Sequence, residues 1–461
     1  MKMLNIKDIQ NLESKEVTTL YRSHISKDLT NIFKVLGYNN FQPTSAYGLK
    51  LFEADNYLLD FSSGLGVLNL GHNHKVVKNA QQYCIDENIP NVYKLGVNRY
   101  QAGLAHNLSQ VTPAQFTSTT LATSGAEAIE AAIKLTSKYF KKERQIYLRA
   151  SNSYHGKTTG ALSLTDAENF GDSFHTFLPN ENIINYKYND SQDLEKIVTQ
   201  IGHNIAAIII EPIQGQTHEV MSKEFALKIN ELAKKFKFLI LCDEIKSGMW
   251  RSGTFLAHTK VGLNPDLITI SKSLGGGLKA ISAMLTTEEI FTRAYRKKSE
   301  ANLHTSTFSG MGHSCVIASQ VIAFMAEPEF TTKLKDAISY AKVRLQNLKN
   351  QFPNKIISID GDGLLLGLSL DLNYFSQIYS RDTKIILHRE INILLMASIL
   401  NELRKKKIYT CFSGTRPNLL YFMPPLIVNN EEIDQFIEAV QSVLDDSTLA
   451  RLIRFTFDQI K

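Results

Sequence analysis

Continuous hydrophobic runs alternate with helical patterns through the central part of the chain. Residues 205–210, 238–242 and 267–270 are the clearest of these runs. Strands that are buried on both faces have this pattern, and they occur in parallel sheets covered by helices. Because the alternation extends over about 200 residues, it predicts an α/β domain.

The two ends of the chain have different patterns. Residues 49–61 read as two short strands of a hairpin, with Asn56 in the turn. Residues 330–352 form a long helical pattern, and residues 355–371 contain a glycine-rich pair of strands. Helical patterns return after residue 390, so the C-terminal part is predicted to be a smaller α+β domain.

We therefore predict three segments. An N-terminal segment covers residues 1–70, a large α/β domain covers residues 71–330, and a C-terminal small domain covers residues 331–461. A chain of 461 residues is long enough for two or three domains.

The composition and charge of the chain argue against two classes of binding partner, nucleic acids and membranes. Hydrophobic residues make up 43% of the chain and charged residues 21%, and the net charge of +6 is spread along it. The densest basic run, residues 404–407, has no interleaved aromatic residues, so we interpret it as a solvated helix end and expect no nucleic-acid partner. No stretch has the ~18 apolar residues of a membrane helix, so we expect no membrane partner.

The four cysteines lie far apart and form no metal-ligand pattern. Isolated cysteines of this kind are typical of reduced thiols in a cytoplasmic protein. The N-terminus also lacks the apolar stretch of a signal peptide. We therefore expect a cytoplasmic protein without a metal site.

Two residues at the ends of hydrophobic runs are the strongest candidates for chemistry. Lys272 follows one run and precedes three glycines, where a backbone can approach a ligand closely. A desolvated lysine can form an imine with a carbonyl compound. Asp243 ends another run, at the sheet edge where open α/β sheets bind ligands, although a helix N-cap is the alternative.

Lys272 and Asp243 are 29 residues apart. One crossover fits in that separation, so both side chains could reach the same edge of the sheet. A lysine imine and a carboxylate that faces a pyridinium nitrogen are the main contributions of a protein to pyridoxal phosphate chemistry.

Two further segments could hold such a cofactor. Ser124 and Glu127 have the spacing of a capping box, and Gly125 and Ala126 between them leave N–H groups for a phosphate at a helix N-terminus. Taken alone, an ordinary capped helix explains this segment better. Tyr154 could stack on an aromatic ring or belong to the core.

In this order, the segments resemble the class III, or ω-type, aminotransferases, a family of fold-type-I pyridoxal phosphate-dependent transferases. The similarity covers about residues 45–445. The putrescine- and ornithine-type members are the most similar, because of residues 304–308. The motifs that carry the resemblance are residues 59–67, 70–74, 124–128, 154–156, 211–215, 243–245, 272, 304–308 and 424–426.

The resemblance implies a large domain with a mostly parallel sheet flanked by helices, and a smaller α+β domain. The cofactor would be pyridoxal 5′-phosphate, bound in the large domain. Residues 1–70 would pack with the small domain and cover the entrance of the active site.

The resemblance also implies roles for individual residues. Lys272 would hold the cofactor as an imine and move the proton of the substrate. Asp243 would keep the pyridine nitrogen protonated, with Glu211 close to Asp243. Tyr154 and Ile245 would pack against the two faces of the cofactor ring.

The phosphate would be bound by Gly125 and Ala126, and Ser124 would also contact the cofactor. Thr307 would reach the same phosphate from the neighbouring subunit, so the active site would be shared within a homodimer. His155 would also contact the cofactor.

Three positions depart from the family pattern. Lys246 stands where the family has a glutamine that contacts the phenolic oxygen of the cofactor. A cation there would stabilise the phenolate; alternatively, Lys246 points to solvent. Gln216 stands where a glutamate usually gates a substrate-binding arginine. Leu420 or Tyr421 stands at the position of that arginine, and Tyr421 is the preferred alignment. Losing both is self-consistent, since either charge left alone would be uncompensated.

Two arginines could replace the missing carboxylate contact. Arg416 lies five residues before Tyr421, and Arg251 is a second candidate. A surface or interdomain ion pair is the alternative for both arginines, and it is slightly favoured for Arg416.

We therefore predict a cytoplasmic, homodimeric aminotransferase that uses pyridoxal phosphate. It would move an amino group from a primary (ω-)amine, a diamine or an amino acid to an oxo-acid by a ping-pong mechanism. A lyase, decarboxylase, racemase or aminomutase on the same fold is the alternative. A cofactor-binding protein without turnover is a further alternative, which the combination of Lys272, Asp243 and Tyr154 disfavours.

Overall fold

The computed structural model describes residues 3–167, 170–372 and 389–445. The chain forms two compact units. The large unit contains residues 63–339 and 360–366, and the small unit contains the rest of the described chain. Among the described residues, no helix is both long and apolar enough to span a membrane.

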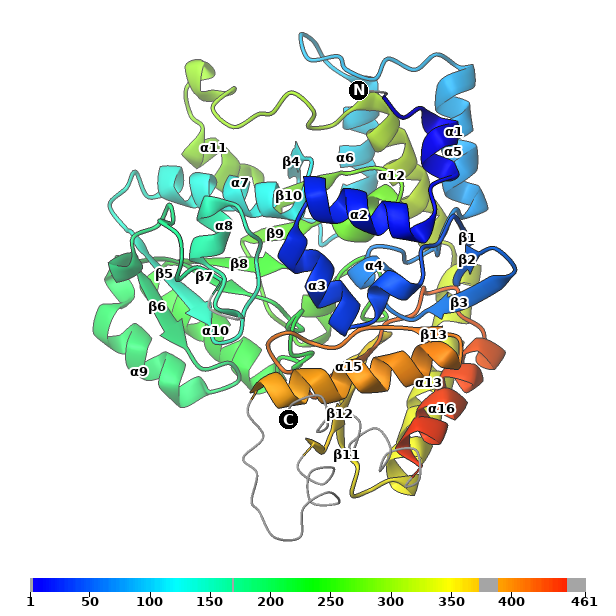
Figure 1. The fold of residues 1–461 in the computed structure, drawn as a ribbon. Coiled ribbons are helices and arrows are strands. Elements are labelled where there is room, and N and C mark those ends of the chain that lie inside the picture. The colour runs from blue at the N-terminus through cyan, green and yellow to red at the C-terminus, as the bar shows by residue number, and fades with distance from the viewer. Residues whose placement is uncertain (1–2, 168–169, 373–388, 446–461) are drawn as a thin grey trace. The chain divides into compact units, whose positions relative to one another are not determined.

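A seven-stranded sheet forms the centre of the large unit (Figure 1). Its strand order is β4-β10-β9-β8-β7-β5-β6. Four neighbouring pairs are parallel, and β10 runs antiparallel to both of its neighbours. The strands are β4 (Ser118–Ala122), β5 (Ile146–Ala150), β6 (Ile183–Tyr186), β7 (Ile205–Ile210), β8 (Leu239–Asp243), β9 (Leu267–Ile270) and β10 (Ser282–Thr286).

The three hydrophobic runs of the sequence are the central strands β7, β8 and β9. Every residue of these strands is buried. The prediction of a mostly parallel sheet is therefore confirmed. These strands are apolar throughout because both of their faces are covered.

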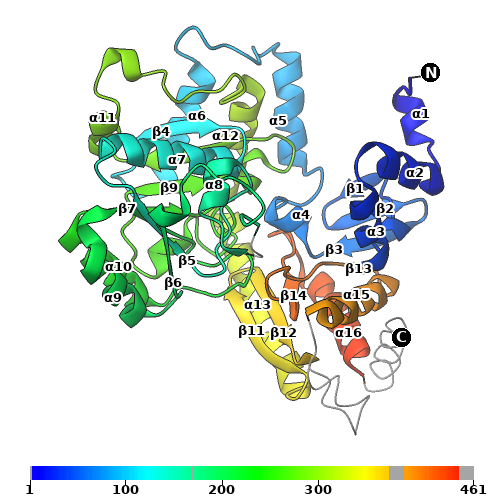
Figure 2. The same cartoon turned by 60° about the vertical axis from the view of Figure 1, so that its left-hand side comes forward.

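Helices flank this sheet (Figures 1 and 2). Helix α7 packs along β4, β9 and β10 through a buried face that includes Ile129, Ile133 and Leu135. The helices of the large unit are α4 (Ser63–Gly66), α5 (Lys75–Asp86), α6 (Arg99–Val111), α7 (Gly125–Tyr139), α8 (Thr159–Ser163), α9 (Ser191–Ile201), α10 (Lys223–Phe236), α11 (Glu288–Ala294) and α12 (Gly312–Met325).

The small unit contains the N-terminal hairpin and most of the C-terminal third. Strands β2 (Lys50–Glu53) and β3 (Asn56–Asp60) pair antiparallel, as the sequence predicts, and Asn56 is the first residue of β3 rather than part of the turn. The structure adds β1 (Ser45–Tyr47) on one side and β13 (Ile408–Tyr409) on the other.

Strand β13 comes from the far end of the chain and pairs parallel with β3. Phe61, Phe422 and Phe436 form an aromatic core in this unit, with ring centroids 4.6–5.4 Å apart. Its helices are α1 (Ile6–Gln10), α2 (Ser14–His24), α3 (Lys27–Val35), α15 (Arg389–Lys405) and α16 (Asn430–Leu444).

Three elements cross from one unit into the other. They are α13 (Pro328–Gln351), β11 (Ile356–Asp362) and β12 (Leu365–Leu370), and β12 also pairs with β14 (Leu419–Phe422). The predicted segments 1–70, 71–330 and 331–461, and the roles given to them, stay predictions.

Candidate active site

Asp243 is the last residue of β8, and it is buried at the carboxyl end of the strand. Its Oδ2 lies 2.7 Å from Nδ1 of His155. Its Oδ1 accepts a hydrogen bond from the backbone N–H of Ile245 at 3.0 Å. The side chain of Asp243 therefore caps a turn and holds a histidine.

Lys272 begins the short 3-10 helix after β9. Its backbone has φ of +47°, a left-handed conformation that is strained for a residue with a side chain. Burial of the amine lowers the pKa of Lys272, while the carboxylates of Asp243 and Glu211 act in the opposite direction. A lysine with a lowered pKa presents more neutral amine near pH 7.

Glu211 follows β7 and is also buried. Its Oε1 accepts the N–H of Gly215 at 2.8 Å, and its Oε2 accepts the N–H of Tyr154 at 3.1 Å. Burial raises the pKa of Glu211; His155 lowers it and Asp243 raises it further. The ends of β7, β8 and β9 thus bring Glu211, Asp243 and Lys272 to one edge of the sheet, as expected for parallel neighbours.

The N-terminus of α7 has the predicted capping box. The Ser124 hydroxyl accepts the N–H of Glu127, and the Glu127 carboxylate accepts the N–H groups of Thr123 and Ser124. Within the described chain, these bonds engage neither the N–H of Gly125 nor that of Ala126. Both groups lie at the positive end of a 15-residue helix.

Gly125 brings this helix end against the turn that follows Asp243. A Cβ added to Gly125 would lie only 2.9 Å from Cδ1 of Ile245. Likewise, a Cβ on Gly156 would lie 2.7 Å from Cβ of Ala126. Two glycines therefore permit the close approach of the helix end, Ile245 and the segment that carries Tyr154 and His155.

Lys246 lies beside the loop that contains Gly215, and its two predicted environments stay predictions. Its ammonium donates to the backbone carbonyl of Gly215 and lies 3.5 Å from Nε2 of His218. Gln216 is the next residue in the same loop and is half-buried. Both residues belong to the large unit, as do all the cofactor-binding candidates.

Three other candidates have a different setting. Tyr421 is buried in β14, and the Arg416 guanidinium donates to the Ser369 hydroxyl. Both belong to the small unit, whereas Lys272 belongs to the large unit. Thr307 is exposed in the large unit.

Arg251 is fully buried in the large unit. Its guanidinium donates to the Asn69 side chain and to the carbonyl of Leu364. It would have to give up these bonds in order to bind a substrate carboxylate. The roles proposed from the sequence for these residues therefore stay predictions.

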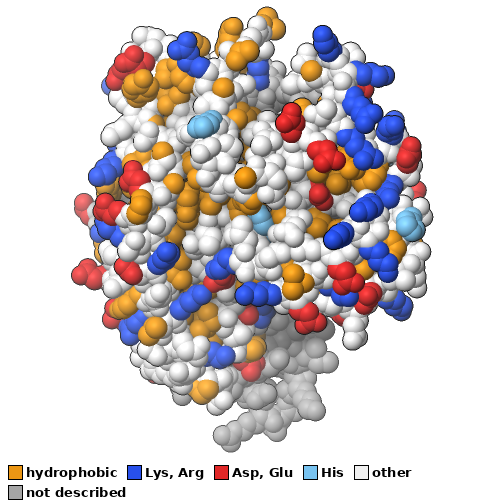
Figure 3. Space-filling model, turned by 180° about the vertical axis from the view of Figure 1, so that it is seen from behind, with side chains coloured by type: hydrophobic (Ala, Val, Ile, Leu, Met, Phe, Trp, Pro, Cys, Tyr) orange, Lys and Arg blue, Asp and Glu red, His pale blue; other side chains and the backbone are white. Residues whose placement is uncertain are grey.

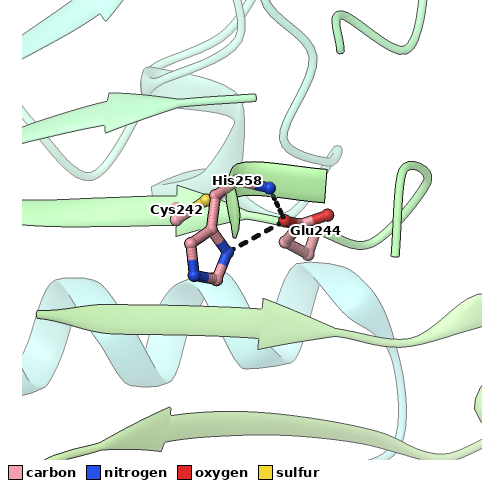
Figure 4. Close-up of side chains that lie close together, drawn as sticks. All are labelled: Cys242, Glu244 and His258. Carbon is pink, nitrogen blue, oxygen red and sulfur yellow. Dashed lines mark hydrogen bonds and ion pairs between the residues drawn. The ribbon is translucent and has the colours of Figure 1, made fainter. Parts of the chain in front are cut away.

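A second polar cluster near Asp243 was not predicted (Figure 4). Cys242, Glu244 and His258 point toward one another, with their potential ligand atoms within 4.8 Å. Glu244 Oε1 accepts from the N–H of His258 at 2.7 Å and lies 3.1 Å from its Nδ1, and Oε2 accepts from Ser247 at 2.6 Å. Burial raises the pKa of Cys242 well above its usual value.

The sequence carried one signal of this cluster, because residues 242 and 244 flank Asp243 and must face away from it in an extended chain. The approach of His258 depends on the fold. Both Glu244 oxygens accept hydrogen bonds from protein groups.

Comparisons with known proteins agree with this architecture. A family model described as "Aminotransferase class-III" matches residues 38–444. Acetylornithine aminotransferase from Bacillus cereus is 28% identical over 417 residues, which are 90% of this chain and 97% of that protein. The enzyme of the same name from Listeria innocua is 30% identical over 389 residues, which are 84% of this chain and 90% of that protein.

Solved structures give the same fold. An ornithine aminotransferase from Toxoplasma gondii superposes with a TM-score of 0.78 at 21% identity, covering 99% of this chain and 100% of that chain. An ω-transaminase from Thermomicrobium roseum gives 0.82 at 22% identity, covering 94% of this chain and 100% of that chain. The chain therefore belongs to the class III aminotransferase family, whose members depend on pyridoxal phosphate.

Proposed function

We propose that Lys272, Asp243 and the N-terminus of α7 form the site at which this aminotransferase holds pyridoxal phosphate. The observation that carries the proposal is the arrangement of Lys272 at the sheet edge. Its amine has a lowered pKa beside the buried Asp243–His155 pair. Its strained backbone adds support, because such strain clusters at functional sites.

The residues present fit the three parts of the cofactor. The Asp243 carboxylate, held by His155, suits a protonated ring nitrogen. The N–H groups of Gly125 and Ala126 suit the phosphate, because they lie at the N-terminus of α7, where the helix dipole favours an anion. Lys272 supplies an amine that can react with the carbonyl carbon of the cofactor.

The bound cofactor would supply an electron-withdrawing ring that stabilises negative charge on the substrate carbon. The Asp243 carboxylate would keep the ring nitrogen protonated, and the His155 hydrogen bond would hold that carboxylate in place. The neutral Lys272 amine would take a proton from Cα of the substrate and deliver it to C4′ of the cofactor. Ile245 and Tyr154 would cover the ring and exclude water.

We propose that the amino donor carries a primary amine remote from its carboxylate, as in an ω-amino acid, a diamine or an ornithine-like molecule, and that an oxo-acid accepts the amino group in a ping-pong reaction. The curated relatives support this class, since those named here are acetylornithine aminotransferases matched over most of their length.

A half-reaction screen tests this proposal. The protein is loaded with pyridoxal phosphate, and putrescine, ornithine, N-acetylornithine, 4-aminobutyrate, alanine and glutamate are added singly without acceptor. We expect an amine of the ω-type to bleach the visible band of the lysine-bound cofactor. Bleaching by alanine alone would overturn the donor class, and release of carbon dioxide or ammonia without transfer would support the lyase alternative.

We also propose a homodimer with a shared active site. In the large unit, Leu95 and Val97 are 99% and 94% exposed, in the loop between α5 and α6 that forms the top of Figure 1. Phe308, next to Thr307, is 58% exposed. Figure 3 shows hydrophobic side chains gathered at the top of the opposite view. Exposed apolar patches mark protein interfaces, and a second copy would cover them.

Light scattering of the loaded protein tests the dimer, and the Leu95→Asp/Val97→Asp double variant tests the surface. We expect a dimer for the wild type and a monomer with strongly reduced activity for the variant. A fully active monomer would contradict the shared site.

We further propose that the enzyme acts in the cytoplasm. All four cysteines are free thiols, and Cys84, Cys242 and Cys315 are buried. Free thiols are typical of a reducing compartment. Fractionation of the native cells, with the protein appearing outside the cytoplasmic fraction, would contradict this proposal.

A further inference from the structure

Residues 154–156 include Tyr154 and His155, two candidates for cofactor contacts, but they belong to no helix or strand. Outside regular structure, backbone N–H groups need other acceptors to hold them in place. Oε2 of Glu211 accepts the N–H of Tyr154 at 3.1 Å. The next N–H, that of His155, has its acceptor in a different part of the large unit.

That acceptor is the side-chain hydroxyl of Thr165. Its Oγ1 accepts the N–H of His155 at 2.9 Å. The same oxygen lies 3.1 Å from the carbonyl oxygen of Gly156 and 3.2 Å from that of Ala161. A hydroxyl has one proton to donate, so these two carbonyls share it. Thr165 is 1% exposed, and its hydroxyl therefore serves the protein backbone rather than solvent.

The turn that carries Thr165 is fixed from strand β5. The guanidinium of Arg149 donates to the carbonyl oxygens of Ser163 and Thr165, at 3.0 and 3.1 Å. It also forms an ion pair with Asp166, at 3.2 Å. The N–H of Asp166 in turn donates to the carbonyl of Ser153 at 3.0 Å. The hydroxyl of Thr165 thus has a support that is tied to β5 and to the residue preceding the segment.

Gly156 shows how little room the segment has. Its φ is +132°, which favours glycine. A Cβ added to it would lie 2.7 Å from Cβ of Ala126 and 3.1 Å from Cβ of Ala161. Ala126 belongs to the end of α7 to which we assign the cofactor phosphate. A small shift of residues 154–156 would therefore change their packing against that helix end.

We propose that Thr165 is a positioning residue of the active site, whose hydroxyl fixes the backbone of His155 so that His155 holds the carboxylate of Asp243. Nδ1 of His155 lies 2.7 Å from Oδ2 of Asp243. This inference rests on the proposed function of Asp243 and Lys272. Within the described chain, no hydrogen bond joins Thr165 to either of them, so its effect passes through His155. Groups of an active site must be held within about 0.5 Å of the productive geometry.

The test compares two replacements of Thr165. Thr165→Val has nearly the same shape but no hydroxyl, so the buried N–H of His155 loses its acceptor. Thr165→Ser keeps the hydroxyl and should restore the wild-type behaviour. Thr165→Ala leaves a space at the same position and, as a second variant without a hydroxyl, should behave as Thr165→Val does.

Thr286→Val is the matched control for the loss of a buried hydroxyl. Thr286 ends β10, and its hydroxyl donates to the carbonyl of Asp266 at 2.9 Å. It pairs with Leu267 at the start of β9, whereas Lys272 follows the end of that strand. The control therefore loses a comparable hydrogen bond in the same unit, away from the proposed site.

The first measurement uses the cofactor-free protein. Hydrogen–deuterium exchange with mass spectrometry reports local opening of the backbone. We expect the peptide that contains residues 153–157 to exchange faster in Thr165→Val than in the wild type, Thr165→Ser or Thr286→Val. Exchange at the wild-type rate would show that the hydroxyl does not fix the segment, and would overturn the inference.

The second measurement follows the visible band of the protein loaded with pyridoxal phosphate as pH is varied. A proton on the ring nitrogen disfavours a second proton on the imine nitrogen. If Asp243 is held less firmly, the ring nitrogen is protonated less, and the pH midpoint of the band should rise. We expect this rise in Thr165→Val and not in Thr165→Ser or Thr286→Val. The charges of Glu211 and Lys246 are the same in all of these variants.

In turnover, Thr165→Val should lower kcat about tenfold or more and change KM less, because a misplaced group acts on the chemical step. Thr165→Ser should stay within about threefold of the wild type. If Thr165→Val and Thr165→Ala lost only stability, as Thr286→Val does, and kept the wild-type midpoint and kcat, the inference would be overturned. Failure of the wild type to form a visible band would instead refute the proposed function.

Discussion

Two pairs of a histidine and a carboxylate lie at the end of β8, and they differ in what surrounds them. Asp243 and His155 are 2.7 Å apart, and Glu244 and His258 are 3.1 Å apart. All four residues are buried. Each of the two adjacent carboxylates contacts its own histidine.

The pair at Glu244 is a closed network. Ser247 and the backbone N–H of His258 bond the two oxygens of its carboxylate. The pair at Asp243 is open in one respect, because within the described chain the buried Nε2 of His155 has no hydrogen-bond partner.

The open pair also has Lys272 and Glu211 as neighbours. We therefore expect the same residue types to serve different purposes in the two pairs. A closed network stabilises the strand end, and an open one beside a lysine with a lowered pKa suits chemistry. The following variants test this contrast, beginning with the largest expected effect.

Replacing Lys272 with alanine should abolish turnover. The variant loses both the imine-forming amine and the group that moves the proton, and the second contribution alone is worth about 10²- to 10⁴-fold. Steady-state kinetics against Lys223→Ala, an exposed control, measure the loss. A Lys272→Ala protein with a tenth of the wild-type kcat would refute the mechanism.

Asp243→Asn should lower kcat by about a hundredfold or more while the protein stays folded. Asparagine is neutral and cannot keep a ring nitrogen protonated, and removing one electrostatic contact of this kind typically costs about 10²- to 10³-fold. Circular dichroism checks the fold, and kinetics check the rate. A kcat within threefold of the wild type would show that Asp243 has no such role.

Glu244→Gln should act on stability instead. The buried network loses its charged acceptor, and leaving buried groups without a partner costs about 1–3 kcal/mol in the free energy of unfolding. Denaturant unfolding measures this change, and we expect kcat of the folded protein to stay within about threefold. If kcat fell as far as in Asp243→Asn, the contrast between the two pairs would be wrong.

The pH dependence of the reactivity of Lys272 tests the role of Glu211. Only the neutral amine of Lys272 is reactive, so its reactivity rises as pH increases through the pKa of Lys272. The Glu211 carboxylate raises that pKa, against the larger effect of burial, so Glu211→Gln should lower it further. The pKa of Lys272 is measured by labelling the cofactor-free protein with an amine-reactive reagent over a range of pH. Glu219→Gln, an exposed change in the same loop, is the control, and an upward shift in Glu211→Gln would contradict the assignment.

Chelation should have the smallest effect. Cys242, Glu244 and His258 are residue types that bind metals, but the Glu244 oxygens are already bonded by the protein. We therefore expect EDTA to leave the melting temperature unchanged. A marked drop, together with stoichiometric metal in elemental analysis, would show that the cluster holds an ion.

Much of the large unit could be predicted from the sequence because its signals are local. Strands β7, β8 and β9 are uniformly apolar, and the capping box of α7 depends on residues three apart. Other features depend on contacts between distant segments. The parallel pairing of β13 with β3 and the approach of His258 to Glu244 have no local signal.

The same reason explains the outcome for Lys246. Its departure from the family pattern was visible in the sequence, but its contact with Gly215 depends on a loop that lies 31 residues earlier. The choice between cofactor and solvent could not be made from neighbouring residues. The fold brings the ammonium to the carbonyl of Gly215, whose own N–H donates to Glu211.

The central claim is that Lys272 is the imine lysine of a pyridoxal phosphate site. The most direct measurement is the visible absorption spectrum of the purified protein with pyridoxal phosphate, for the wild type and for Lys272→Ala, before and after reduction with borohydride. We predict a visible band in the wild type only, and a cofactor fixed by reduction to the peptide that contains Lys272. A band that persists in Lys272→Ala, or a reduced cofactor on another lysine, would contradict the account.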